Sequence, residues 1–143
     1  MKSLILLSIL ILVAIIPSCA QTGSKTWTQD ELQDPSILAH LLTDPNIEKP
    51  FIFNIGPMDN IKGAVEIGPA KDKSNLEELR QALSKVPKDK TVIIYCGCCP
   101  FRVCPNIRPA FALLKEMKFT KARLLNIPHN LKIDWIDQGY PMH

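Results

Sequence analysis

A run of apolar, mostly β-branched residues, Thr91–Tyr95, stands directly before four cysteines that lie within nine positions of one another. The run does not alternate between apolar and polar residues, which is typical of a parallel strand buried on both faces. The segment after Asn106 has helical periodicity, so Cys96 is expected where a strand ends and a helix begins. In open α/β sheets ligands bind at this edge, and a helix N-terminus offers N–H donors to an anion or a thiolate. The sequence therefore predicts a parallel α/β fold with a cysteine of lowered pKa, and hence a reactive thiolate, at its ligand-binding edge.

Strands and helices alternate along the rest of the chain. Asp34 opens a short helix with apolar periodicity. Ser74 and Glu77 form a capping-box pattern at the start of a second helix, and Asn106 is the expected N-cap of a third. We expect a three-layer α/β domain in which helices flank a central, largely parallel sheet. The predicted strands cover residues 51–55, 63–67, 91–95 and 122–127, and a short terminal helix covers residues 133–138.

The composition fits one globular domain and excludes nucleic acid as a partner. The 143 residues are 46% hydrophobic and 22% charged, which suits a single core once a targeting segment is removed. The formal net charge is only +3, without a block of Lys and Arg, so the chain lacks the electrostatic footprint of a nucleic-acid-binding protein. We expect a monomer that needs no cofactor.

The N-terminal residues 1–20 have the pattern of a signal peptide, with a basic start and an apolar core too short for a membrane span. Two cleavage sites fit. The segment that ends at Cys19 resembles a bacterial lipobox, with Cys19 as the lipidated first residue, whereas a small-x-small rule would place cleavage before Gln21. The isolated cysteine favours the lipoprotein, although Pro17 is unusual in a lipobox. We expect an exported protein on the periplasmic or outer surface, anchored by lipid to a bacterial membrane, with a tether at 21–25 and the domain at 26–143.

The order of these segments resembles the rhodanese family from about Thr26 to His143. The shared features are the Glu31-Leu32 segment, the Gly63-Ala64 turn, the strand that leads into Cys96, Trp135, and the final Gly139-Tyr140-Pro141. In that family a cysteine at the position of Cys96 holds a substrate sulfur as a persulfide, cradled by the N–H groups of a tight loop. The resemblance implies a sulfurtransferase in which Cys96 takes a sulfane sulfur from a small donor and passes it to a thiol acceptor.

The loop and its surroundings differ from the family pattern. The residues expected to bind substrate around Cys96 are Gly97, Cys98, Cys99 and Arg102. Positions where the family usually has Asp, Arg and His are here Asn54, Gly56 and Asn60. Arg102 could balance an anionic substrate through paired hydrogen bonds, or it could lie exposed on the enlarged loop. His129 follows the last strand, at the same sheet edge as Cys96, where it could assist proton transfer.

The other three loop cysteines allow three interpretations. As resolving thiols, they would turn the protein into a thiol-disulfide redox protein. As soft ligands, Cys96, Cys98, Cys99 and Cys104 could bind Zn²⁺ or Cu(I). As a structural pair, Cys104 would form a disulfide with Cys98 or Cys99 in an oxidising compartment. We expect this disulfide and no resting metal, because the crowding of three cysteines within four positions should hinder tetrahedral closure.

Overall fold

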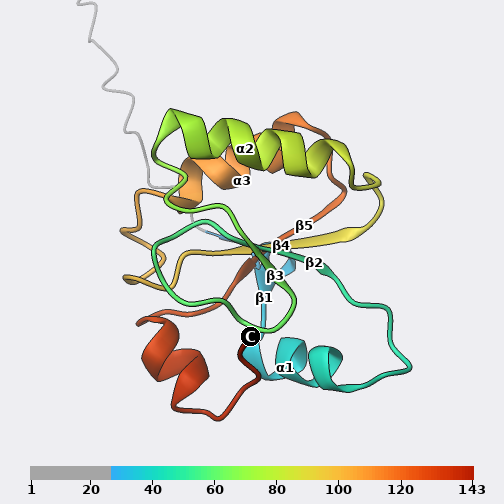
Figure 1. Ribbon diagram of the computed structural model, residues 1–143, viewed down its shortest axis with the longest axis vertical. Helices are drawn as coiled ribbons and strands as arrows, with labels where there is room; N and C mark the ends of the chain where they lie inside the picture. Colours follow the sequence, from blue (N-terminus) through green and yellow to red (C-terminus); the bar gives the residue numbers. More distant parts are fainter. Residues whose placement is uncertain (1–26) are drawn as a thin grey trace, which may run out of the picture.

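The computed structural model describes residues 27–143, which form a three-layer α/β domain. Five strands build one sheet in the order β1-β5-β4-β2-β3, with helices on both faces (Figure 1). The predicted fold class is therefore confirmed. The predicted signal peptide, tether and Cys19 lie outside the described residues. Within residues 27–143, no helix has both the length and the apolar character needed to cross a membrane.

Every strand pair in this sheet is parallel, and β4 lies at its centre. It pairs with β2 on one side and with β5 on the other. The two outer strands, β1 and β3, complete the edges by pairing with β5 and β2. The strand bounds are β1 Leu32–Gln33, β2 Phe51–Asn54, β3 Ala64–Glu66, β4 Thr91–Tyr95 and β5 Lys121–Leu125.

Two pairs of helices cover the two faces of the sheet (Figure 1). Helices α2 (Lys73–Ser84) and α3 (Ile107–Glu116) pack on one face. Helix α1 (Pro35–Thr43) and the π-helical segment η2 (Lys132–Ile136) pack on the other. A short 3-10 helix, η1 (Gln29–Glu31), precedes β1.

Side chains of β4 alternate between two separate cores. Val92 and Ile94 point to the α2 and α3 side, and Cys96 continues this series. Ile93 and Tyr95 point to the side of α1 and η2. Both sets are apolar because helices cover both faces, which explains the unalternating run in the sequence. This register places Cys96 on the face that α3 covers.

The start of α2 differs from the prediction. The helix begins at Lys73 after the N-cap Asp72, so Ser74 lies inside the first turn and not at the cap. Its first backbone bond runs from the Leu76 N–H to the Asp72 carbonyl, directly after a turn in which the Asp72 N–H donates to Pro69. This turn therefore determines where the helix begins, and the predicted start at Ser74 is wrong by two residues, since the N-cap is Asp72.

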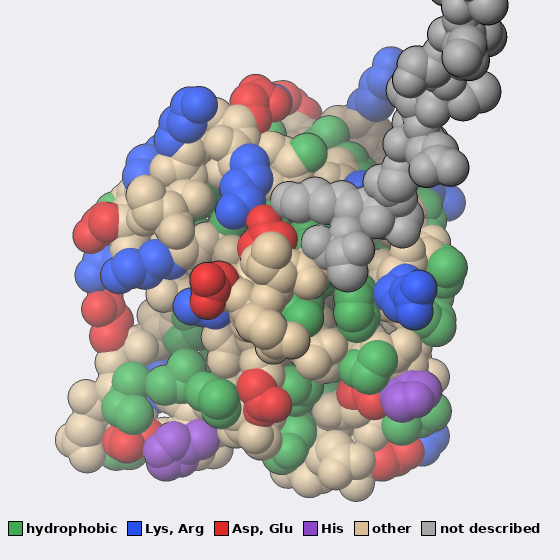
Figure 2. All heavy atoms as spheres, turned by 180° about the vertical axis from the view of Figure 1, so that it is seen from behind, with side chains coloured by type: hydrophobic (Ala, Val, Ile, Leu, Met, Phe, Trp, Pro, Cys, Tyr) green, Lys and Arg blue, Asp and Glu red, His purple; other side chains and the backbone are tan. Residues whose placement is uncertain are grey.

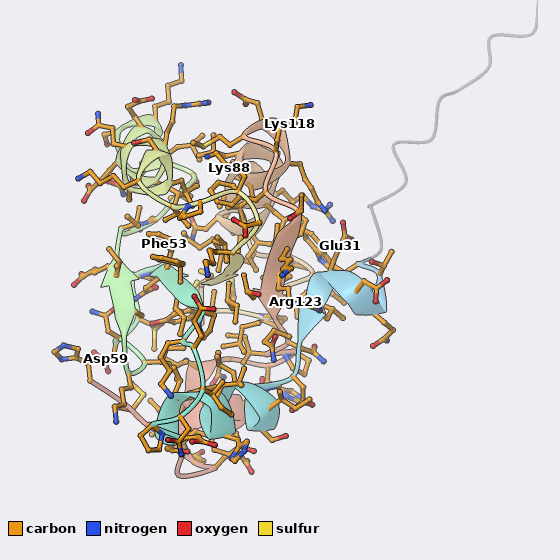
Figure 3. All side chains as sticks on the ribbon, turned by 90° about the vertical axis from the view of Figure 1, so that its right-hand side faces the viewer. Glu31, Phe53, Asp59, Lys88, Lys118 and Arg123 are labelled. Atoms are coloured by element: carbon orange, nitrogen blue, oxygen red, sulfur yellow. The ribbon has the colours of Figure 1, made fainter. Side chains whose placement is uncertain are left out.

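Strand β1 was not predicted, since a strand of two residues leaves no periodicity to detect. Tertiary contacts hold it against β5. The Arg123 guanidinium on β5 donates to the carbonyls of Asp30 and Leu32 at 2.9 and 3.3 Å, and Figure 3 shows Arg123 beside this segment. On the face seen in Figure 2, cationic and anionic side chains are interspersed, so that this face presents no continuous field of one sign.

Candidate thiolate site at the end of β4

Cys96 directly follows β4 and is completely buried. It opens the loop that leads to α3, drawn from yellow to orange in Figure 1. Cys104, near the end of this loop, is also buried, with 3% of its surface exposed. Cys98 is exposed and Cys99 is half-buried. The loop therefore has two sulfurs anchored inside the domain and two nearer to its surface.

The four sulfur atoms converge on one point. All four Sγ atoms lie within 4.8 Å of one another. The Cys98 Sγ lies 3.2 Å from that of Cys96 and 3.3 Å from that of Cys99. The cluster of Cys96, Cys98, Cys99 and Cys104, called here the thiol cluster, could hold a metal ion.

This convergence overturns the argument that crowding prevents four-ligand closure. The loop folds back on itself, with a turn in which the Val103 N–H donates to the Pro100 carbonyl, and returns Cys104 to the end of β4. The spacing of the cysteines in the sequence shows how crowded they are, but it does not show that the loop brings Cys104 back to the end of β4. All four cysteines are free thiols in the structure, and the disulfide between Cys104 and Cys98 or Cys99 stays a prediction for the oxidised protein.

Asn106 fixes the position of the Cys96 sulfur. Its Nδ2 donates to the Cys96 Sγ at 3.2 Å, while its Oδ1 accepts from the backbone N–H of Lys71 at 3.0 Å. The residue stands at the expected N-cap of α3, but its side chain makes no capping bond. The amide is instead a buried link between the thiol cluster and the turn before α2. Sequence reasoning missed this role, because the Lys71 partner lies 35 positions away.

Two glycines allow the backbone to approach Cys96 closely. A Cβ on Gly56 would lie 2.6 Å from the Cys96 Sγ and 2.3 Å from its carbonyl oxygen, so no side chain fits there. Gly97 has φ of +76°, and a Cβ there would lie 2.9 Å from that of Leu131. The Leu131 N–H donates to the Gly97 carbonyl at 2.8 Å, which ties this loop to the one after β5. The absence of a side chain at position 56 thus has a steric reason.

Neighbouring thiols keep Cys96 ionised. The pKa of Cys96 is lowered from its ordinary value to about 5, chiefly by a hydrogen bond from the Cys104 thiol, and further by the Asn106 amide and Cys98. Burial acts in the opposite direction but is outweighed. The pKa of Cys98 is raised to about 12, first by partial desolvation of its sulfur, although the residue as a whole is exposed, and then by its bond to Cys96. The pKa of Cys104 is raised chiefly by its bond to Cys96. At neutral pH Cys96 is a thiolate held by the protonated thiols of Cys98 and Cys104.

The cause of this low pKa differs from the expected one. The sequence suggested backbone N–H groups at the start of a helix, whereas the largest contribution comes from another cysteine of the loop. Such a thiolate can act as a nucleophile, as a metal ligand or as the attacking sulfur in disulfide exchange.

The two remaining candidates lie on exposed surfaces. Arg102 is exposed and forms no hydrogen bond or ion pair with any residue from 27 to 143, so its role in substrate binding stays a prediction. His129 is bound at Nδ1 to the Asp134 carboxylate at 2.9 Å, and its side chain is 64% exposed. Leu131, two residues after His129, is bonded through its N–H to the carbonyl of Gly97 in the cysteine loop.

No family model matches this chain, and the search of curated proteins finds no match either. The resemblance to the rhodaneses therefore remains a prediction from the sequence, and the thiol cluster has to be interpreted from its own geometry.

Proposed function

We propose that the protein binds one soft metal ion, Zn²⁺ or Cu(I), through the thiol cluster. The convergence of four Sγ atoms within 4.8 Å carries this proposal. Thiolate is the ligand that both ions prefer. The four cysteines come from one short loop held between β4 and α3, so the ligands are brought together by the fold before any ion arrives.

The distances suit a tetrahedral ion after small adjustments. Zinc–sulfur bonds of about 2.3 Å place the sulfurs of a tetrahedral site about 3.8 Å apart. The closest pairs, at 3.2 and 3.3 Å, would open by about half an ångström, and the widest would close by about 1 Å. Cys98 and Cys104 must lose a proton to bind the ion, because their pKa values are raised, whereas Cys96 is already ionised at neutral pH. Binding should therefore release protons and strengthen as the pH rises.

Cobalt titration of the reduced protein tests this proposal. We expect one Co²⁺ per chain, with the sulfur-to-metal charge-transfer band of a tetrahedral thiolate site, displaced by a stoichiometric amount of Zn²⁺. Cys104→Ser should weaken the band, whereas Cys19→Ser should leave it unchanged, since Cys19 lies outside the loop. Absence of stoichiometric binding under reducing conditions would reject the metal site.

Sulfur transfer at Cys96 is a second candidate. The ionised Cys96 at the carboxyl end of β4 favours it, together with the resemblance to the rhodaneses. The thiolate would attack the outer sulfur of thiosulfate, release sulfite and keep the sulfur as a persulfide. Cyanide or a thiolate would then remove that sulfur and restore the Cys96 thiolate.

Thiosulfate and cyanide distinguish the two candidates. A sulfurtransferase would form thiocyanate catalytically in metal-free buffer and gain one sulfur atom in its intact mass, and Cys96→Ser would abolish both. Cys99→Ser is the matched control, because it removes a thiol of the same loop but leaves Cys96 intact. A protein that binds metal and shows no turnover would eliminate this candidate.

We also propose export and lipid anchoring at Cys19, from the pattern of residues 1–20. Mature protein should partition with membranes and begin at a modified Cys19. A freely soluble product that begins at Gln21 would show ordinary signal cleavage instead.

A further inference from the structure

The thiol cluster is uneven in its exposure. Cys96 and Cys104, with 0% and 3% of their surfaces exposed, lie at the two ends of the loop, next to β4 and α3. Cys98 and Cys99 lie between them, one exposed and one half-buried. A zinc site that only supports the fold has all four coordination positions filled by protein ligands. In this cluster two of those ligands lie in the core and two lie nearer to the surface, so an ion would be held by the domain on one side and face solvent on the other.

Cys98 contacts one buried and one half-buried sulfur. It contacts Cys96 at 3.2 Å and Cys99 at 3.3 Å, and it is the most exposed member of the cluster. The buried Cys96 is in turn fixed by Asn106 and by the lack of space at Gly56. Of the four ligands, Cys98 therefore has the most freedom to leave an ion without disturbing the core.

Resting on the proposed metal site, we infer that Cys98 is the exchange ligand through which the ion passes to and from a thiol-bearing partner. An incoming thiolate binds the ion, and the bond between the ion and the Cys98 Sγ breaks. The proton that the incoming thiol gives up is taken by the released Cys98 sulfur. Charge and electrons balance, and the ion keeps its oxidation state. The cluster would then hold its metal as cargo for transfer between thiols.

Rescue by an external thiol tests the exchange position. Reduced protein is loaded with Cd²⁺, and the sulfur-to-cadmium charge-transfer band is measured for the wild type, Cys98→Ser and Cys104→Ser. Each variant should lose about a quarter of the band, because one of four sulfurs is removed. Added glutathione should restore the band in Cys98→Ser, where the vacant position faces solvent. It should not do so in Cys104→Ser, where the position is buried.

Limited alkylation of the loaded wild type provides a second measurement that depends on no variant. Iodoacetamide followed by peptide mass mapping should label Cys98 first, and the band should fall as that label appears. Equal rescue of both variants, no rescue of Cys98→Ser, or first labelling at Cys96 or Cys104 would overturn the inference while the metal site stands. A wild type with no cadmium band would reject the metal site itself and this inference with it.

Discussion

Two glycines and an asparagine shape the surroundings of Cys96. Gly56 leaves room for its sulfur and carbonyl, Gly97 turns the chain with a positive φ, and Asn106 donates to the sulfur. None of the three carries reactive chemistry of its own. Together they hold a thiolate in a buried position, where an unpaired charge would otherwise be strongly disfavoured. The reactivity of Cys96 is therefore a property of its neighbours.

Gly56→Ala should displace Cys96 and destabilise the protein. The added Cβ would lie 2.3 Å from the Cys96 carbonyl oxygen and 2.6 Å from its sulfur, so the backbone must shift. We expect a loss of about 1–3 kcal/mol in the free energy of unfolding, measured by urea denaturation. Gly63→Ala is the control: its surroundings are open within 4 Å, and only its φ of +79° opposes the substitution. The rate at which Cys96 is alkylated measures the displacement of its sulfur and should change in Gly56→Ala. An equally large change in Gly63→Ala would contradict the steric argument.

Asn106→Leu should raise the pKa of Cys96. The substitution removes a donor that favours the thiolate, so that a higher pH is needed to ionise the sulfur. It also removes the acceptor of the Lys71 N–H, a partly buried bond whose loss should cost about 0.5–1.5 kcal/mol of stability. Thiolate absorbance followed against pH measures the first effect. Asn46→Leu, at an exposed position, should change neither property, and an unshifted titration in Asn106→Leu would refute the role of the amide.

At the scale of elements, the periodicity of the sequence predicted the main strands and helices. Features that depend on contacts between residues distant in the chain were missed. The run Thr91–Tyr95 and the helices around it were found because burial on one or two faces repeats along the chain. Strand β1 was missed because two residues carry no period, and the start of α2 because a turn at Pro69 decided it. The four closely spaced cysteines were recognised in the sequence. The convergence of their sulfur atoms could not be predicted, since it depends on how the loop returns to β4.

Tyr95 connects β4 to the loop after β2, and Tyr95→Phe should loosen that loop. The Tyr95 hydroxyl accepts from the Ile61 N–H at 3.0 Å and donates to the Asp59 carbonyl at 3.2 Å. Removing it leaves a buried N–H unpaired, at a cost of about 1–3 kcal/mol. Hydrogen exchange at Ile61 should accelerate accordingly. Tyr140→Phe is the matched control, because the ring of Tyr140 packs edge-on against Trp135. Equal protection of Ile61 in wild type and Tyr95→Phe would disprove this link.

At the scale of the whole molecule, the thiol cluster couples the stability of the domain to pH. Its charged member lies in the core between the sheet and α3, so that the folded state and the unfolded chain bind different numbers of protons. Other groups with lowered pKa values, Asp34 and Glu116, have ordinary values near 4 and titrate below the range in which Cys96 acts. A change in the free energy of unfolding between about pH 5 and pH 9 therefore reflects the ionisation of the thiol cluster.

Within this interval, the reduced, metal-free protein should become more stable as the pH rises. The unfolded chain keeps the Cys96 proton up to its ordinary pKa of 9.0, whereas the folded state has lost it above about 5. Stability rises with pH wherever the unfolded state binds more protons, here by at most about 1.4 kcal/mol per pH unit. Above pH 9 the sign reverses, because unfolding releases protons from Cys98 and Cys104, whose pKa values are raised in the folded state. Urea denaturation from pH 5 to pH 10 should thus give a maximum near pH 9. Cys96→Ser should remove the rise on the acid side, and a wild type whose stability is level or falls between pH 6 and pH 8 would show that Cys96 is not a buried thiolate.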